Sequence, residues 1–323
     1  MMDNKIRNRM AGGIWGLIVG DALGVPVEFE GRDKRVKDPV TGMRGHGTYD
    51  QPVGTWSDDS TMTLCTIEGM TGAFSYDAIM KRFLRWKNEA YMTPYDEVFD
   101  MGSSTCAAIT RYERGASALG SGGTDEHSNG NGSLMRILPA AYYLYAKNGN
   151  DYSQKALSYE IVHSISALTH AHAISQMSCG IYCSVICHLL NGKEIEKAIQ
   201  NGIEDAKRYY LTLPEMSGYL DLFDLVDADF LANAEEDEIA SGGYVLSSLE
   251  AALWCVLHST SLKECLLKAV NLGRDTDTIA AIAGGLAGTA YGKEAVPAEW
   301  RSVIAKKEMI ELLCRKFFKA LDI

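Results

Sequence analysis

The sequence predicts an all-α protein, a multi-helix fold with a single compact domain over residues 1–323. Only seven prolines interrupt the chain, and apolar residues recur at helical spacing along most of its length. Convincing alternating strands are scarce, and the segments 25–30 and 42–56 are expected to hold only a little extended structure. A prior of roughly 150 residues per domain favours two domains. However, the one linker-like segment, 115–133, is too short and too early to divide two cores.

The predicted helices begin near the N-terminus, where residues 7–24 carry a one-sided apolar stripe. Residues 174–192 are apolar nearly all round, so we expect a central helix that ends at the C-cap signal Asn191-Gly192. The other segments with helical periodicity are 61–72, 76–90, 134–147, 154–168, 193–210, 244–259 and 262–273.

Small residues cluster in residues 12–24 of the first predicted helix and in one further helical segment, 279–292. Glycine inside a helix costs about 1 kcal/mol relative to alanine, so its repeated use favours a close approach of helix backbones. The first segment is not a dinucleotide fingerprint, because no strand precedes it and the glycine spacing differs.

The composition limits the partners and the compartment. A net charge of −11 argues against bulk binding to nucleic acid or anionic lipid, which requires a positive field. The N-terminus lacks the pattern of a signal peptide, and no apolar run approaches the ~20 residues of a membrane span. The eight cysteines form no zinc pattern and are interpreted as reduced, three of them on one face of the central helix. We therefore expect a cytoplasmic monomer with no membrane partner.

The stretch Ser57-Asp58-Asp59 places two carboxylates side by side, and two interpretations compete. Ser57 can cap a helix whose first turn holds both acids, which the helix dipole stabilises by roughly 0.3–1 kcal/mol. The alternative is a metal site, because carboxylate and hydroxyl oxygens are the ligands that hard cations prefer.

A second acidic cluster, Asp275-Thr276-Asp277-Thr278, has the same chemistry at the start of another small-residue helix. Capping requires one such side chain, not two alternating carboxylates. Four carboxylates from two helix starts are enough to hold two cations, which together orient a substrate and activate a water. The spacing alone does not place the clusters together, since over two hundred residues separate them.

Four other features offer polar chemistry, each with a structural alternative. Asp21, in an apolar helix, is expected to be a buried and hydrogen-bonded carboxylate. Glu28, between two apolar residues, is either a surface glutamate or an acid–base group with a raised pKa. The Asn/Gly-rich loop 128–136 is either a turn or a cradle for phosphate. His170 and His172 are expected to contact a ligand or to be satisfied core histidines rather than zinc ligands.

Taken in order, these pieces resemble the ADP-ribosylglycohydrolase family, which includes the dinitrogenase reductase-activating glycohydrolases. The similarity extends through nearly the whole chain. The motifs that carry it are GLIVGDALGVPVEF, GTWSDDSTM, FDMGSST, NGNGSLMR, LTHAHA, GGYVLSSLEAALW and GRDTDTIAAIAGG.

The resemblance implies an all-α fold around a central cleft with two Mg²⁺ or Mn²⁺ ions. The metal ligands that it implies are Ser57, Asp58, Asp59, Asp275, Asp277 and Thr278. The catalytic residues are taken to be Glu28, Asp59 and Asp277. We hypothesise that Glu28 transfers a proton or binds a ribose hydroxyl, and that Asp59 or Asp277 orients the attacking water. The substrate-binding residues that it implies are Asp100, Gly102, Gly130, Asn131, Gly132, Ser133, His170 and Tyr244, the last of them near the adenine.

The resemblance also implies the reaction: water cleaves the bond between ADP-ribose and an acceptor at the anomeric carbon of the ribose. The acceptor favoured here is arginine on a protein, with serine-linked or O-acetyl ADP-ribose as alternatives. Two rivals are a non-catalytic ADP-ribose-binding protein and a hydrolase of the diphosphate bond that releases AMP. Three departures from the family pattern are Ser57 in place of threonine, Arg274 in place of glycine, and the string FDMGSST.

Overall fold

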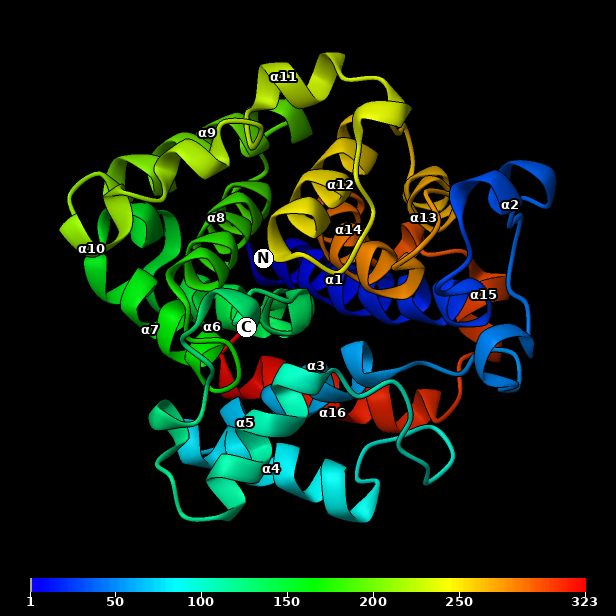
Figure 1. The fold of residues 1–323 in the computed structure, drawn as a ribbon, viewed down its shortest axis with the longest axis horizontal. Coiled ribbons are helices and arrows are strands. Elements are labelled where there is room, and N and C mark those ends of the chain that lie inside the picture. Colours follow the sequence, from blue (N-terminus) through cyan, green and yellow to red (C-terminus); the bar gives the residue numbers. More distant parts are fainter. Residues whose placement is uncertain (1) are drawn as a thin grey trace.

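The computed structural model describes residues 2–323, and every regular element in that range is a helix (Figure 1). The α-helices are α1 (Met2–Gly24), α2 (Arg32–Lys37), α3 (Asp58–Met70), α4 (Tyr76–Glu89), α5 (Ser103–Glu113), α6 (Leu138–Asn148), α7 (Ala156–Ala167), α8 (Ala173–Leu190), α9 (Ile195–Tyr210), α10 (Pro214–Ser217), α11 (Ala228–Asn233), α12 (Val245–Leu257), α13 (Leu262–Asn271), α14 (Thr276–Tyr291), α15 (Ala298–Val303) and α16 (Lys307–Ala320). The 3-10 helices are Val25–Val27, Gly47–Tyr49, Ala118–Gly120, Glu126–Ser128, Asn131–Arg136, Gly149–Gln154, Leu220–Phe223, Glu236–Glu238 and Lys293–Ala295. The all-α prediction is confirmed.

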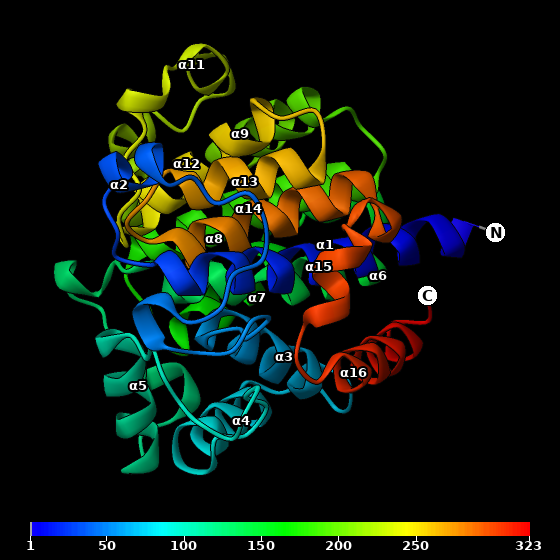
Figure 2. The same ribbon diagram turned by 90° about the vertical axis from the view of Figure 1, so that its right-hand side faces the viewer.

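Helices α1 and α14 form the central antiparallel pair and lie side by side (Figure 2). A Cβ added to Gly16 would lie 2.2 Å from the carbonyl oxygen of Gly284, and a Cβ added to Gly284 would lie 2.2 Å from that of Gly16. The two backbones are therefore in direct contact, as the small residues predicted. The same register brings Gly24 at the end of α1 against Asp277 at the start of α14.

The other helices cover this pair from two sides. Figure 1 and Figure 2 show α3, α4, α5 and α16 on one side and α9, α12 and α13 on the other. The central helix α8 ends at Leu190, with Gly192 at φ +78°, which confirms the C-cap signal. All eight cysteines are free, and those of α8 are buried in the core.

One expectation about apolar length was wrong. The segments Asn4–Val27 and Ala173–Leu190 are long and apolar enough to cross a membrane by length and composition. However, 100% and 83% of their apolar windows are buried inside the protein. Their apolar character therefore reflects their central place in the fold.

The expected extended segments contain no strand. Residues 25–30 begin with the 3-10 helix Val25–Val27, because Pro26 supplies no donor but fixes a helical φ at the first turn. Residues 42–56 hold one isolated bridge, between His46 and Gln51, around the 3-10 helix Gly47–Tyr49. The predicted helix 134–147 is also divided: Asn131–Arg136 is 3-10, and α6 begins only at Leu138, with proline in its first turn.

Candidate functional site

The start of α3 confirms the capping interpretation without excluding the other. Ser57 is the N-cap, and its hydroxyl oxygen accepts a hydrogen bond from the backbone N–H of Asp59 at 3.3 Å. The same hydroxyl donates to Oδ2 of Asp59 at 3.1 Å. Asp58 and Asp59 occupy the first turn, where the unpaired N–H groups of the helix favour negative charge.

Asp21 holds this turn against α1. Its carboxylate accepts hydrogen bonds from the backbone N–H groups of Ser57 at 2.9 Å and Ser60 at 3.0 Å, and from the hydroxyl of Ser60. Burial raises the pKa of Asp21 to about 6, although these hydrogen bonds oppose the shift. Asp21 is therefore the buried structural carboxylate that the sequence predicted, and it fixes the start of α3 to the end of α1.

The two acidic clusters meet in space. The hydroxyl of Thr278 donates to Oδ2 of Asp59 at 3.2 Å, across 219 residues of sequence. Candidate ligand oxygens of Glu28, Asp275 and Asp277 all lie within 4.8 Å of one another. Glu28, predicted as an acid–base group, thus also belongs to the group of carboxylates best placed to hold a cation.

The carboxylates of the site are poorly compensated by other protein groups. Burial, followed by the charge of Asp100, raises the pKa of Glu28 to about 9. Burial also raises the pKa values of Asp58, Asp59 and Asp277 well above their usual range, with further contributions from neighbouring acids. Among the described residues that line the cavity, none is lysine or arginine.

Three buried oxygens at the site have no hydrogen-bond partner: Oε2 of Glu28, Oδ1 of Asp59 and Oδ2 of Asp277. A buried acceptor without a partner is costly, and an ionised one more so. Oxygen-only ligands with uncompensated negative charge are the donor set that Mg²⁺ and Mn²⁺ prefer. The residues present therefore fit a hard divalent cation.

The Asn/Gly-rich loop also lines the cavity and is fixed to the second cluster. The side-chain amide of Asn131 donates to Oδ2 of Asp275 at 2.7 Å and to the hydroxyl of Ser248 at 2.9 Å. A Cβ on Gly132 would lie 2.9 Å from Cε1 of His170, so only glycine fits there without a shift. Asn131 thus orients a carboxylate of the acidic cluster.

His170 is held in one tautomer by the residues behind it. The buried guanidinium of Arg136 donates to Oγ1 of Thr169 at 2.8 Å, and Oγ1 lies 2.8 Å from Nδ1 of His170. Among the described residues, Nδ1 is the one acceptor that lies within reach of the Oγ1 proton, so the hydroxyl donates to Nδ1 and Nε2 carries the ring hydrogen. Burial and the charge of Arg136 lower the pKa of His170 to about 3, so the ring is neutral.

These walls enclose a cavity of about 390 Å³. The predicted residues that line it are Glu28, Asp58, Asp100, Gly102, Gly130, Asn131, Gly132, His170, Asp275 and Thr278. Asp59, Asp277 and Ser57 are buried beside it and complete the acidic cluster. Lining residues that lie in the quoted motifs but were not named as site residues are Phe29, Met101, Ser103, Ser104, Thr105, Met135 and Gly243. The residues around Ser103 carry no signal beyond their place after Asp100 and Gly102.

Two predicted substrate contacts differ from the rest. The Ser133 side chain faces the core, where its oxygen accepts from the hydroxyl of Ser166 at 2.9 Å, and it does not line the cavity. Tyr244 is not among the residues that line the cavity; 43% of its surface is exposed, and it forms an isolated bridge with Gly130. His172 has a structural role as the N-cap of α8, because its Nδ1 accepts a hydrogen bond from the backbone N–H of Ile174.

Arg274, the departure beside the second cluster, has φ +65°, a conformation that glycine adopts more easily. Its backbone pairs with the loop that carries Glu28: Phe29 N–H donates to the Arg274 carbonyl, and Arg274 N–H donates to the Glu30 carbonyl, both at 2.6 Å. Its side chain lines a neighbouring cavity of about 610 Å³, together with Arg32. Arg274 is therefore not among the residues that line the acidic cavity.

Comparisons with known proteins agree with this geometry. The family model described as ADP-ribosylglycohydrolase matches residues 2–322. The chain is 29% identical to the ADP-ribosylarginine hydrolase Tri1 of Serratia proteamaculans, over 98% of this chain and 80% of that protein. It is 30% identical to the Tri1 protein of Pseudomonas putida, over 96% and 78%.

A more distant relative and a solved structure give the same result. The ADP-ribosyl-(dinitrogen reductase) glycohydrolase of Rhodospirillum rubrum is 27% identical, over 95% of this chain and 94% of that protein. A structure titled ADP-ribosylglycohydrolase-related protein complex superposes with a TM-score of 0.78 at 26% identity, over 98% of this chain and 99% of that chain. The chain therefore belongs to the ADP-ribosylglycohydrolase family and is a hydrolase of glycosidic bonds.

Proposed function

We propose that this hydrolase depends on Mg²⁺ or Mn²⁺ and removes ADP-ribose from modified arginine side chains of proteins. The observation that supports the proposal most directly is the Thr278–Asp59 hydrogen bond, which joins the two acidic clusters beside a cavity. The three buried carboxylate oxygens without partners add the donor set that a divalent cation requires.

The residues that would hold the cations are Ser57, Asp58, Asp59, Asp275, Asp277 and Thr278, with the Glu28 carboxyl beside them. When bound, such cations supply Lewis-acid polarisation of substrate oxygens and lower the pKa of a water. Ser57 and Thr278 each donate a hydrogen bond to Asp59, so that its carboxylate is held in place to orient the attacking water.

The other residues of the cavity bind and orient the substrate. Glu28 is a buried carboxyl whose raised pKa allows it to hold a proton at neutral pH, and in the reaction it transfers that proton or binds a ribose hydroxyl. The glycine-rich loop 130–132 leaves backbone room for the diphosphate, and Nε2–H of His170 donates a hydrogen bond into the cavity from the same side.

The arginine acceptor is supported by two relatives, whose names state that they hydrolyse ADP-ribosylarginine. Serine-linked and O-acetyl ADP-ribose remain the alternatives. The intact acidic clusters favour catalysis over simple ADP-ribose binding. We expect the protein to act in the cytoplasm as a monomer.

A panel of substrates tests the proposal. Arginine-linked, serine-linked and O-acetyl ADP-ribose would each be offered with Mg²⁺, with Mn²⁺ and with EDTA, and the products separated by chromatography. We expect free ADP-ribose from the arginine conjugate only when a cation is present. Release of AMP would identify a hydrolase of the diphosphate bond. Binding without turnover in every arm would identify a non-catalytic protein.

A further inference from the structure

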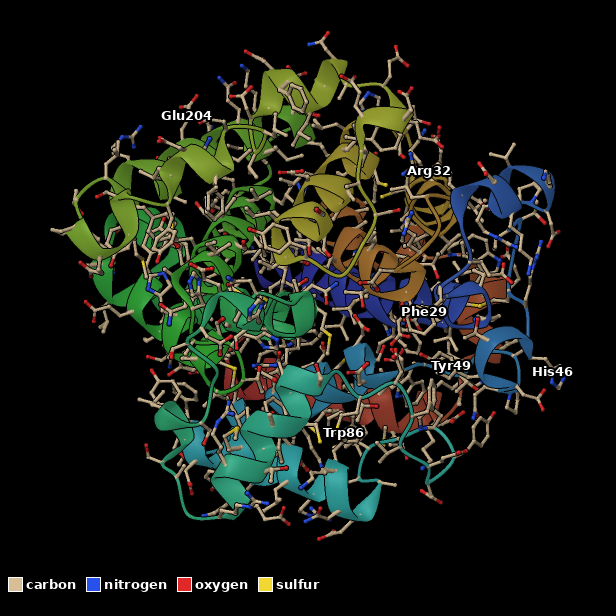
Figure 3. All side chains as sticks on the ribbon, viewed as in Figure 1. Phe29, Arg32, His46, Tyr49, Trp86 and Glu204 are labelled. Atoms are coloured by element: carbon tan, nitrogen blue, oxygen red, sulfur yellow. The ribbon has the colours of Figure 1, made fainter. Side chains whose placement is uncertain are left out.

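Three aromatic rings lie together where Phe29 lines the cavity. The Phe29 and Tyr49 ring centroids are 6.4 Å apart at 62°, and those of Tyr49 and Phe99 are 4.9 Å apart at 47°. Figure 3 shows Phe29 and Tyr49 on neighbouring loops at the same side of the molecule. Phe29 lines the cavity, yet 68% of its surface is exposed. An exposed ring at the mouth of a polar cavity leaves apolar surface available to a ligand.

The position of Phe29 is fixed by its backbone. Phe29 has φ +64°, a conformation that costs a bulky residue of the order of 1–2 kcal/mol. The paired hydrogen bonds with Arg274 hold it there, and the hydroxyl of Thr48 donates to the carbonyl of Glu28 at 2.7 Å. The ring is thus kept next to the acidic cluster by contacts on both sides of its loop.

The place of the rings along the substrate follows from two groups of residues that line the cavity. The glycine-rich loop and His170 form one group, and Gly130 of the loop pairs with Tyr244. Glu28 and Phe29 form the other group, with Glu28 against Asp275 and Asp277. In the proposed function the loop takes the diphosphate and the carboxylates take the anomeric carbon, which leaves Phe29 to contact the acceptor.

The groups beside Phe29 suit a flat cation. Tyr49 hydrogen-bonds the Glu28 carboxyl and also interacts with Asp100, so the aromatic faces stand beside two carboxyl groups. A guanidinium stacks on aromatic faces and its N–H groups donate hydrogen bonds to carboxyl oxygens, whereas a serine or acetyl oxygen has no such donors.

We propose that Phe29, Tyr49 and Phe99 form an acceptor-binding subsite, and that the acceptor they take is a guanidinium group. The inference rests on the proposed function, whose acceptor it accounts for. It makes Phe29 a specificity residue that contacts the acceptor side chain and does not contact the ADP-ribose moiety.

The test uses the full chain with Mg²⁺ and two probes. One is an ADP-ribosyl-arginine peptide as substrate, and the other is free ADP-ribose as a competitive inhibitor. Phe29→Leu keeps an apolar side chain but removes the aromatic face, Phe29→Tyr restores the face, and Phe74→Leu is the same substitution away from the cavity, where Phe74 packs on Tyr143.

We expect Phe29→Leu to lower kcat/KM for the peptide between about twofold and thirtyfold, the range of a cation–π contact, with no change in the inhibition constant of ADP-ribose. Phe29→Tyr and Phe74→Leu should behave as wild type. An equal loss of ADP-ribose affinity would show that Phe29 contacts ADP-ribose, and an unchanged kcat/KM would show that the ring takes no part; either result overturns the inference.

The wild-type protein separates this inference from the proposed function. Release of ADP-ribose from serine-linked or O-acetyl substrates but not from arginine would contradict the guanidinium subsite while leaving a metal-dependent glycohydrolase. Release from none of these conjugates would contradict the proposed function and, with it, the subsite.

Discussion

Removal of one buried carboxylate should reduce the stability that the folded protein gains when a cation binds. We choose Asp277→Asn, because Asp277 is fully buried, its Oδ2 has no hydrogen-bond partner, and asparagine keeps the size of the side chain. Without a cation, the folded wild-type chain holds mutually repelling carboxyl groups whose pKa values are raised by burial. The variant loses one of these groups and should be at least as stable as wild type in EDTA.

The size of the effect follows from binding linkage. A cation at 100 times its dissociation constant adds about 2.7 kcal/mol to the free energy of unfolding. An unfolding entropy of about 2.1 cal/mol/K per residue gives about 0.7 kcal/mol/K for a chain of 323 residues. The wild-type Tm should therefore rise by about 4 °C, and the Tm of Asp277→Asn by much less.

Differential scanning calorimetry of EDTA-treated protein, titrated with Mg²⁺ and then Mn²⁺, measures this shift. Ser302→Ala is a matched control, because Ser302 is exposed and lies outside the acidic cluster. The control should keep the full wild-type shift. A full shift in Asp277→Asn as well would refute the assignment of Asp277 as a ligand.

Three further outcomes follow from the same structure. In EDTA, Tm should fall as pH rises from about 7.5 to about 8.5, because the Glu28 pKa is about 9 when folded and 4.5 when unfolded, and the buried His163 and His170 are neutral in both states above their ordinary pKa of about 6.5; a rising Tm, followed by calorimetry, would contradict this. Gly16→Ala should destabilise the chain by about 1–3 kcal/mol in urea unfolding, because its Cβ would lie 2.2 Å from a carbonyl oxygen of α14. Gly72→Ala, where a Cβ meets no atom within 4 Å, should leave the stability unchanged, and equal stability of the two variants would argue against the helix contact. Thr169→Val removes the hydrogen bond that fixes the His170 tautomer, so the ¹⁵N NMR shifts of the ring should change and ADP-ribose binding should weaken about twofold to tenfold. Thr169→Ser should retain the wild-type shifts and affinity, and unchanged shifts in Thr169→Val would contradict the proton assignment.

Local signals predicted much of the fold and part of the site. Apolar periodicity located the long helices, and the glycines of α1 and α14 indicated their close contact. The capping chemistry of Ser57 was also visible, because an N-cap depends on neighbours in sequence. The resemblance to the family then supplied the residues of the cavity, most of which the structure brings together.

Two helices and the meeting of the acidic clusters were not predicted from the sequence. Helix α5 was missed because its buried face is made of small residues such as Thr105 and Ala108, which give a weak apolar stripe. Helix α16 was overlooked although Ile310, Cys314 and Phe317 recur at helical spacing. The joining of the two acidic clusters depends on the register of α1 against α14, which no local pattern specifies.

The central claim is that the joined carboxylates of both clusters carry out hydrolysis with a bound cation. The most direct measurement is the turnover of an ADP-ribosyl-arginine peptide by Asp58→Asn/Asp277→Asn, with Mg²⁺ present and helical folding checked by circular dichroism. We predict free ADP-ribose from the wild type and none above the uncatalysed rate from the double variant. Wild-type turnover by the folded double variant would contradict the claim.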